Sequence, residues 1–333
     1  MISLIEALNY RCLRYVRQEM RPFQILVGPN ASGKTTLMDV LGFLHDLVAD
    51  GLDEAIAARS ANFHDLVWQH GDTGFELAVE ALISESNREQ LEDTSFDRVR
   101  YEVRIGSDQD ANEVRIEKER AFLKGAVPST HDPSAMRGAT RSLFATDVSI
   151  PRGARLFEKT VPNGDVYHVA GRDSEGGEHL SFRFGPRKST LANLPEDEVQ
   201  FPEATRFKQL LQEGVVPYEL EGRRLRAASA PGQSRHLRKD GANLPWSIAN
   251  IDRQAPKRLQ EWIAHLRTAL PDLCSISTVE RPEDRHRYLR LHYRDGLVVP
   301  SWMTSDGTLR LLALTLPAYL DNFNGVYLIE EPE

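Results

Sequence analysis

The chain has 333 residues, of which 41% are hydrophobic and 27% are charged, and its formal net charge is −8. This composition is typical of a soluble globular protein with one large or two smaller domains, and the acidic balance argues against a wholly basic nucleic-acid-binding protein. The sequence shows no membrane-spanning run, no signal peptide and just two cysteines, Cys12 and Cys274, so it predicts a cytoplasmic protein without a disulfide framework, a cysteine-rich zinc site or a membrane partner.

Residues 2–15 alternate loosely between apolar and polar, which predicts a strand followed by a turn. This region contains the run Asn9-Tyr10-Arg11-Cys12-Leu13, just before the next predicted strand. Arg11 is either an ordinary surface residue or a residue that contacts the phosphates or the adenine of a nucleotide. The residues alone leave both interpretations open.

The segment QILVGPNASGKTTLMDVL, residues 24–41, organises the rest of the prediction. Residues 25–27 predict a buried strand, and residues 36–44 predict a helix with leucine and valine at helical spacing. Between them, Gly28 and the run Gly33-Lys34-Thr35 complete the pattern G-x-x-x-x-G-K-[ST]. A preceding strand and a following helix are the context in which this pattern forms a phosphate-binding P-loop.

The residue types in this loop suit a triphosphate. Gly28 and Gly33 let the backbone wrap closely, and the helix N-terminus adds the positive end of its dipole. Lys34 would reach the β- and γ-phosphates, and the Thr35 hydroxyl would ligate Mg²⁺. The predicted phosphate-binding residues are Gly28, Asn30, Ala31, Ser32, Gly33, Lys34, Thr35 and Thr36.

The middle of the chain predicts a helix, a turn and then several strands. The turn, residues 62–74, carries Gln69 and His70. Period-two alternation predicts an antiparallel sheet beside the nucleotide-binding strand, formed by residues 75–83, 99–105 and 113–122. Further segments are a helix at 52–60, a loop at 125–140 and an insertion at 142–199, which we interpret as a lid or arm.

The following segments predict helices at residues 204–214 and 256–270 and a strand at 287–292. Between the two helices, basic residues gather around the loop Ala230-Pro231-Gly232. They form either a solvated basic loop or a contact for phosphate or nucleic acid. These residues are Arg223, Arg224, Arg226, Arg235, Arg238 and Lys239.

Two features near the C-terminal end of the sequence suggest ligand binding, namely a helix start and an acidic strand end. Ser305 and Gly307 stand at the start of a strongly apolar helix, where a hydroxyl and free N–H groups are available to an anion. Residues 326–329 then predict a buried strand that ends in Glu330 and Glu331. Paired carboxylates are costly there without a cation. We therefore expect Glu330 to hold Mg²⁺ through water, and Glu331 to orient or deprotonate the attacking water.

In this order, the motifs resemble the head of an ABC-type ATPase of the RecF/SMC/OLD-like group, the AAA family ATPases of the bacterial defence type. Residues 9–13 resemble the end of its N-terminal strand, and GPNASGKTTLMDVL matches its P-loop. SDGTLRLLAL and IEEPE look like its signature and Walker B motifs, and DGANLP is similar to the OLD-like subgroup. The resemblance covers roughly the first 80 and the last 110 residues.

The resemblance implies an α/β fold, that of a P-loop NTPase with an ABC-ATPase-like head. It would have a mixed central sheet, an antiparallel β subdomain and an inserted lid or arm. We expect an N-terminal lobe at 1–124, an insertion at 125–203 and a C-terminal lobe at 204–333. It also implies ATP and Mg²⁺ as cofactors, with Gln69 in a Q-loop that senses Mg²⁺. Lys34, Gln69 and Glu331 would be catalytic, and Thr35, Gln69 and Glu330 would hold the metal.

The same resemblance implies partners. ATP would close a homodimer in which Ser305 and Gly307 of one copy reach the γ-phosphate bound by the other, and hydrolysis would open it. The head would regulate a separate effector, such as a nuclease, in anti-phage defence or DNA maintenance. DNA itself could bind through Arg223, Arg224, Arg235, Arg238 and Lys239. A nucleotide-binding module without turnover and a P-loop kinase are the alternatives.

The sequence departs from the family pattern in three places. Glu330 stands where many ABC proteins have Asp, and Asp306 stands where the common signature has Gly. The sequence ends at Glu333, before the D-loop and switch histidine that the resemblance places next, and it contains no TOPRIM nuclease domain. We therefore expect a head that is truncated after its Walker B motif. The sequence leaves open whether such a chain hydrolyses ATP by itself.

Overall fold

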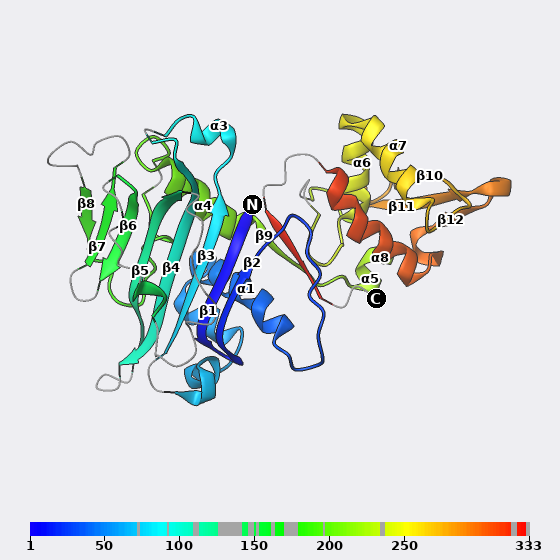
Figure 1. The fold of residues 1–333 in the computed structure, drawn as a ribbon. Coiled ribbons are helices and arrows are strands. Elements are labelled where there is room, and N and C mark those ends of the chain that lie inside the picture. Colours follow the sequence, from blue (N-terminus) through cyan, green and yellow to red (C-terminus); the bar gives the residue numbers. More distant parts are fainter. Residues whose placement is uncertain are drawn as a thin grey trace. The chain divides into compact units, whose positions relative to one another are not determined.

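The computed structural model of the chain forms two compact units, residues Met1–Val215 and Val216–Glu333. Figure 1 shows the large sheet of the first unit and the helices and short sheets of the second. The structure describes residues 1–71, 74–91, 93–108, 113–125, 142–145, 150, 153–160, 164–169, 179–195, 197–233, 237–320 and 325–330.

The first unit is built on an eight-stranded sheet with the order β2-β1-β3-β4-β5-β6-β7-β8. Neighbouring strands are antiparallel. The strands predicted at residues 75–83, 99–105 and 113–122 are confirmed. The bounds are β1 Ile2–Tyr10, β2 Leu13–Glu19, β3 Phe75–Leu82, β4 Phe96–Asp108, β5 Glu113–Gly125, β6 Arg155–Thr160, β7 Gly164–His168 and β8 His179–Phe182.

Strands β6, β7 and β8 fall within residues 125–203, where the sequence predicted a separate insertion. They instead continue the sheet that begins in the N-terminal segment, so the boundary predicted at residues 124 and 125 does not divide the structure. The division between the units comes later, after Val215. Short strands between glycine-rich turns gave no periodic signal long enough to reveal this pairing. The loop predicted at 125–140 lies outside the described residues from 126 onward.

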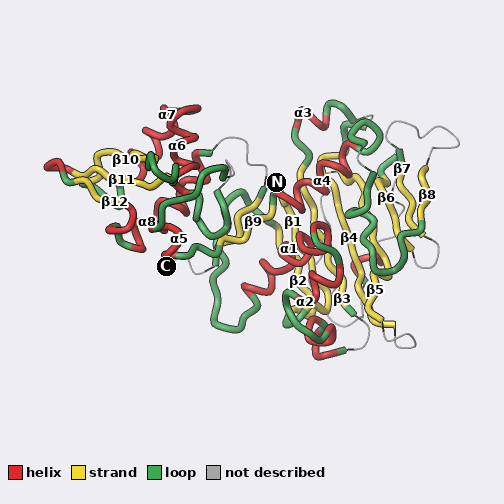
Figure 2. Tube along the Cα trace, turned by 180° about the vertical axis from the view of Figure 1, so that it is seen from behind, coloured by secondary structure: helices red, strands yellow, loops and turns green. Residues whose placement is uncertain are grey.

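Helices α1 (Lys34–Ala49) and α4 (Pro202–Glu213) cover one face of the sheet, as Figures 1 and 2 show from opposite sides. The ring of Phe43 in α1 lies 5.3 Å from the ring of Phe75 in β3, and Phe207 in α4 lies 5.7 Å from Tyr101 in β4. The helices also contact each other, since His45 Nδ1 lies 2.8 Å from the Leu211 carbonyl oxygen. This face is the apolar core of the first unit.

The opposite face of the sheet carries a buried network of charges. Glu80 is 1% exposed and accepts hydrogen bonds from Lys124 at 2.6 Å and Arg100 at 3.0 Å. Arg100 also donates to Glu102 at 2.6 Å, and Arg120 donates to the other oxygen of Glu102 at 2.6 Å. Each of these carboxylates therefore has a cation within hydrogen-bond distance, which offsets the cost of burying it.

Other elements of the first unit are short. They are α2 Leu52–Ala57, η1 Phe63–Leu66, η2 Trp68–His70, α3 Glu85–Arg88 and η4 Leu143–Ala145. The predicted helices at 52–60 and 204–214 are present as α2 and α4. Among the described helices, none combines the length and the hydropathy that crossing a membrane requires.

In the second unit, helices α5, α6, α7 and α8 share an apolar core with a three-stranded antiparallel sheet, β10-β11-β12. Trp262 of α7 is fully buried and donates to Thr315 Oγ1 at 2.8 Å, which confirms the predicted apolar face of this helix. The bounds are β9 Val215–Tyr218, α5 Gly222–Arg226, α6 Leu244–Gln254, α7 Pro256–Leu266, β10 Leu273–Glu280, β11 Arg287–Tyr293, η5 Arg294–Gly296, β12 Val298–Pro300, η6 Ser301–Met303, α8 Asp306–Thr315, η7 Leu316–Tyr319 and β13 Val326–Ile329.

The last strand, β13, pairs with β9 in a two-stranded sheet. The sequence predicted a buried strand here. The strand is present, but its residues are half-buried and Ile329 is 37% exposed. A two-stranded sheet cannot cover both faces of a strand, which accounts for the difference. The rings of Tyr327 and Tyr218 stack across this pair with their centroids 5.0 Å apart.

The charge network predicts a pH-dependent stability. Burial raises the pKa of Glu80, but its hydrogen bond with Lys124 and the charge of Arg100 lower it more, so the pKa lies below the ordinary value of 4.5. The contribution of Glu80 to stability is therefore present above pH 4.5 and is lost as the pH falls through its folded-state pKa. Glu80→Gln should lower the free energy of unfolding at pH 7 by about 3 kcal/mol, and the difference should shrink in acid.

Urea unfolding at pH 7 and at pH 3.5 measures this difference. Glu19→Gln is the control, because Glu19 is 70% exposed and pairs with Arg17 on the surface, so its loss should change stability by less than about 0.5 kcal/mol. Equal losses from the two variants at pH 7 would contradict the role given to the network.

Candidate nucleotide-binding site

Helix α1 presents its N-terminus to the loop of residues 28–33. The helix begins at Lys34, and Gly33 precedes it with a φ of 91°. The amide of Leu37 donates to the Gly33 carbonyl at 2.9 Å, which closes the first helical turn. The sequence predicted this helix at residues 36–44, and the structure extends it at both ends.

Both glycines of the motif stand where a side chain would collide. A Cβ on Gly28 would lie 2.9 Å from the Ser32 hydroxyl oxygen. A Cβ on Gly33 would lie 3.0 Å from Leu13 Cδ2 and 3.3 Å from Cys12 Sγ. The positive φ of Gly33 also favours glycine, because L-residues rarely adopt it. The loop is thus compact, as a phosphate-binding loop must be.

Lys34 folds back over the loop. Its Nζ donates to the carbonyl oxygens of Gly28 and Pro29, both at 2.8 Å. Asn30, Ala31 and Ser32 are exposed at the tip of the loop. An ammonium group held at the mouth of a helix N-terminus, beside exposed backbone, is a donor set that fits phosphate oxygens.

The hydroxyl residues that follow Lys34 differ in their surroundings. Thr35, the predicted Mg²⁺ ligand, is exposed in the first turn of α1, whereas Thr36 is 8% exposed. The Thr36 hydroxyl accepts from Cys12 Sγ at 3.2 Å. Thr35 is therefore accessible to a hydrated cation, and Thr36 ties the helix to the β1–β2 turn.

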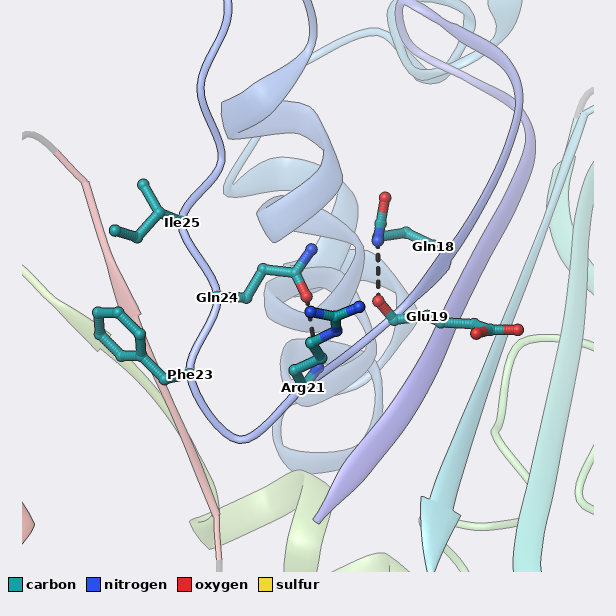
Figure 3. Close-up of a pocket in the computed structure, with 6 residues that line it drawn as sticks. All are labelled: Gln18, Glu19, Arg21, Phe23, Gln24 and Ile25. Atoms are coloured by element: carbon teal, nitrogen blue, oxygen red, sulfur yellow. Dashed lines mark hydrogen bonds between the residues drawn. The ribbon is translucent and has the colours of Figure 1, made fainter.

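The segment before the loop corrects one prediction. Residues 25–27 were expected to form a buried strand, but they form no strand, and Phe23, Ile25 and Val27 are 80%, 70% and 88% exposed. In Figure 3, Phe23 and Ile25 point to one side of this extended segment and Gln24 to the other. A strand needs a neighbour to receive its backbone hydrogen bonds, and no described strand pairs with these residues.

A pocket of about 420 Å³ lies between this segment and the end of β2. The Arg21 amide donates to Gln24 Oε1 at 3.3 Å, which helps to fix the bend between the two. The pocket is lined by Gln18, Glu19, Arg21, Phe23, Gln24 and Ile25.

Arg11 lies beside α1. Its Nη1 donates to Asp39 Oδ2 at 2.9 Å, and the Tyr10 hydroxyl donates to the same oxygen at 2.7 Å. The Arg11 side chain is 39% exposed. The structure therefore places Arg11 next to the helix that follows the loop, and its contact with a nucleotide stays a prediction. The sequence gave no indication of the role of Asp39.

Gln69 lies in a loop that is tied to the same turn. Gln69 and His70 are exposed and have φ angles of 53° and 54°, which are unusual for residues other than glycine. The Arg11 amide donates to the Leu66 carbonyl at 2.9 Å, and Tyr10 forms a β-bridge with Val67. The structure thus joins the loop that carries Gln69 to the turn that carries Arg11, while the Mg²⁺-sensing role of Gln69 stays a prediction.

In the second unit, the predicted signature turn forms the start of α8. Ser305 is the N-cap residue, and its hydroxyl oxygen accepts from the Thr308 amide at 3.1 Å. Gly307 is exposed, with open space where a Cβ would lie. Asp306 pairs with Arg226 at 3.1 Å. The turn therefore exposes a hydroxyl and a helix start beside a neutralised carboxylate.

The acidic end of the chain is described as far as Glu330, which is exposed directly after β13. Glu331, the predicted catalytic base, lies outside the described residues. The convergence of these carboxylates with Thr35 on one magnesium ion stays a prediction.

The basic segment is largely paired with carboxylates of its own unit. Arg224 lies 3.6 Å from Glu221, Arg238 lies 3.2 Å from Asp240, and Lys239 lies 3.9 Å from Glu219. These carboxylates weaken the positive potential that the sequence pattern indicates. Arg223 is exposed on α5, and Arg235 lies outside the described residues.

Residues 23–333 match the family model described as an AAA domain, putative AbiEii toxin, of a type IV toxin–antitoxin system. The chain belongs to this family. Membership confirms the predicted AAA-type ATPase head, and the P-loop lies within the matched residues. Among curated proteins, none matches the chain.

Solved structures similar to this AAA-domain protein include heads of SMC proteins. An SMC head bound to the C-terminal winged-helix domain of ScpA is 15% identical, with a TM-score of 0.47, over 97% of this chain and 77% of that one. An SMC head with an extended coiled coil, bound to the C-terminal domain of ScpA from Pyrococcus furiosus, is 14% identical, with a TM-score of 0.43, over 99% and 82%.

The contact of Gly33 with the β1–β2 turn can be tested by substitution. Gly33→Ala should lower the free energy of unfolding by about 1 kcal/mol through its positive φ, and it should also push Cys12 and Leu13 away from the loop and weaken nucleotide binding. Gly296→Ala is the control, because Gly296 has a φ of 76° but open space around a Cβ. Thermal unfolding measures the backbone strain that the positive φ causes in both variants. Titration with a fluorescent ATP analogue measures how crowding against Cys12 and Leu13 changes nucleotide affinity. Equal nucleotide affinity in the two variants would contradict the contact.

Proposed function

We propose that this chain is an ATP-binding and ATP-hydrolysing head that dimerises on ATP. Its dimer would regulate a separate effector, such as a nuclease, in anti-phage defence or DNA maintenance. The observation that carries the proposal is the compact loop at the N-terminus of α1, where Lys34 folds back onto the Gly28 and Pro29 carbonyls. Membership of an AAA-domain family supports the interpretation of this loop as a nucleotide-binding loop.

In the proposed site, the amides of residues 30–36 and the N-terminus of α1 hold the phosphates. Lys34 exchanges its two carbonyl partners for oxygens of the β- and γ-phosphates. Thr35, Gln69 and, through water, Glu330 would hold Mg²⁺, which would supply positive charge against the phosphates. Glu331 accepts the proton of the attacking water.

Ser305 and Gly307 complete the site from a second copy. Both are exposed, and the helix start behind them carries a partial positive charge. When they contact the γ-phosphate bound by the first copy, ATP joins the two copies, and loss of that phosphate releases them. An effector that binds one of the two states would then follow the nucleotide state.

Glu331→Gln should abolish turnover and trap the ATP-bound dimer. Loss of a general base lowers kcat by about 100-fold or more, while the phosphate-binding residues stay intact. Phosphate release and light scattering after gel filtration with ATP and Mg²⁺ measure the two effects. Lys34→Ala should instead weaken ATP binding and abolish the dimer.

Glu333→Gln is the matched control for charge, and it should behave as the wild type. Normal turnover by Glu331→Gln would overturn the catalytic assignment. A wild-type chain that binds ATP and dimerises without releasing phosphate would be a nucleotide-binding module rather than a hydrolase.

We also propose DNA as a partner of the basic segment. Arg235→Glu with Arg238→Glu should lower duplex affinity and make the slope of log affinity against log salt shallower by roughly one unit per lost phosphate contact. Arg253→Glu, a charge reversal at an exposed position of α6, is the control. Fluorescence anisotropy at several salt concentrations measures the slope, and equal slopes in the two variants would remove DNA from the list of partners.

A further inference from the structure

Asp39 is a meeting point of three elements of the first unit. It lies in the second turn of α1, and its side chain is 16% exposed. One oxygen accepts from the Tyr10 hydroxyl at 2.7 Å and from Arg11 Nη1 at 2.9 Å. The other accepts from Arg59 Nε at 2.7 Å. A single carboxylate therefore binds the end of β1, the β1–β2 turn and the segment after α2 to the P-loop helix.

The two arginines at Asp39 differ in what else they contact. Arg59 is 8% exposed, lies over the Phe43 ring at 5.1 Å, and donates through Nη1 to Asp46 and to the Ala55 carbonyl, both at 2.7 Å. Arg11 is 39% exposed and binds Asp39 through one terminal nitrogen. A guanidinium carries five N–H donors in a rigid plane, so Arg11 retains donors that face solvent.

The backbone around Arg11 is held in an unusual conformation. Asn9 and Arg11 have φ angles of 57° and 49°, which are costly for residues other than glycine and need support from their surroundings. Asp39 supplies that support on the helix side. The Leu66 carbonyl, which accepts from the Arg11 amide, supplies it on the other side.

The same turn reaches the phosphate-binding loop. Cys12 contacts Thr36, and Leu13 Cδ2 would lie 3.0 Å from a Cβ on Gly33. Thr36 and Asp39 are three residues apart on α1, so they share one face of the helix. The turn therefore runs along that face toward the loop, with Arg11 bound to Asp39 and the next two residues beside Thr36 and Gly33.

We infer that Asp39 is a positioning residue for the nucleotide: it holds Arg11 in the orientation in which the remaining guanidinium donors contact ATP in the P-loop. The inference rests on the proposed function, since it requires that the loop binds ATP. An arginine side chain loses rotamer entropy when it binds a ligand, and a preformed ion pair removes part of that cost in advance.

Asp39→Asn tests the inference. The variant should bind ATP about tenfold more weakly, because Arg11 loses a charge-assisted hydrogen bond that orients it, while kcat at saturating ATP should change much less. Asp46→Asn is the matched control. It removes the other carboxylate of Arg59 from the same helix, but Asp46 has no bond to Tyr10 or Arg11, so ATP affinity should stay within about twofold of the wild type.

A double-mutant cycle distinguishes positioning from a structural role. Arg11→Ala should weaken ATP binding to a similar extent, and Asp39→Asn should add less than about twofold in the Arg11→Ala background. Titration with a fluorescent ATP analogue gives the affinities, and thermal midpoints show whether each variant is folded.

Two results would overturn the inference and leave the proposed function standing. One is that Asp39→Asn and Arg11→Ala lower ATP affinity independently of each other. The other is equal ATP affinity in Asp39→Asn and Asp46→Asn. If Asp39→Asn does not fold, Arg11→Ala decides alone, and unchanged ATP affinity in that variant overturns the inference. A wild-type chain that binds no ATP would overturn the proposed function and this inference with it.

Discussion

The phosphate-binding loop is held in place by the packing of helix α1 against the sheet. Val40, Leu41, Leu44 and Leu47 are fully buried, and burial of each such side chain is worth about 1.5–3 kcal/mol. Phe43 adds ring contacts with Tyr10 and Phe75 at 5.8 and 5.3 Å. Most of the stability of a helix in a protein comes from such packing, so this packing is what keeps the N-terminus of α1, and the loop before it, in a fixed position.

Polar contacts then orient the groups that the packing brings together. Asp39 and Thr36, on the partly polar side of the same helix, hold the turn that carries Arg11, and that turn holds the loop that carries Gln69. Three sequence segments predicted to serve the nucleotide thus meet in the first unit through hydrogen bonds of ordinary length. In the second unit, the serine cap of α8 and the pairing of Asp306 with Arg226 similarly shape the turn that was predicted to be the signature motif.

Local patterns predicted much of this from the sequence. The glycine spacing of the P-loop and the period of three to four in α1 and α7 depend on contacts within a few residues, and both are present. Helix α6 was missed, although Asn243 before Pro245 is a helix-start signal. The exposure of Ile25 and Val27 was not predictable, because a short apolar run indicates a buried strand but not which strand it pairs with. Asp39 also escaped notice, since its partners lie 20 to 29 residues away.

The central claim is that the early glycine loop and the late acidic strand serve one magnesium-bound triphosphate. A structure of the chain with Mg²⁺ and a non-hydrolysable ATP analogue tests it most directly. We predict that the Thr35 hydroxyl and the Glu330 carboxylate lie at the same ion, with Ser305 of a second copy at the γ-phosphate. A nucleotide bound in the loop with Glu330 and Glu331 on an unrelated face would contradict the claim.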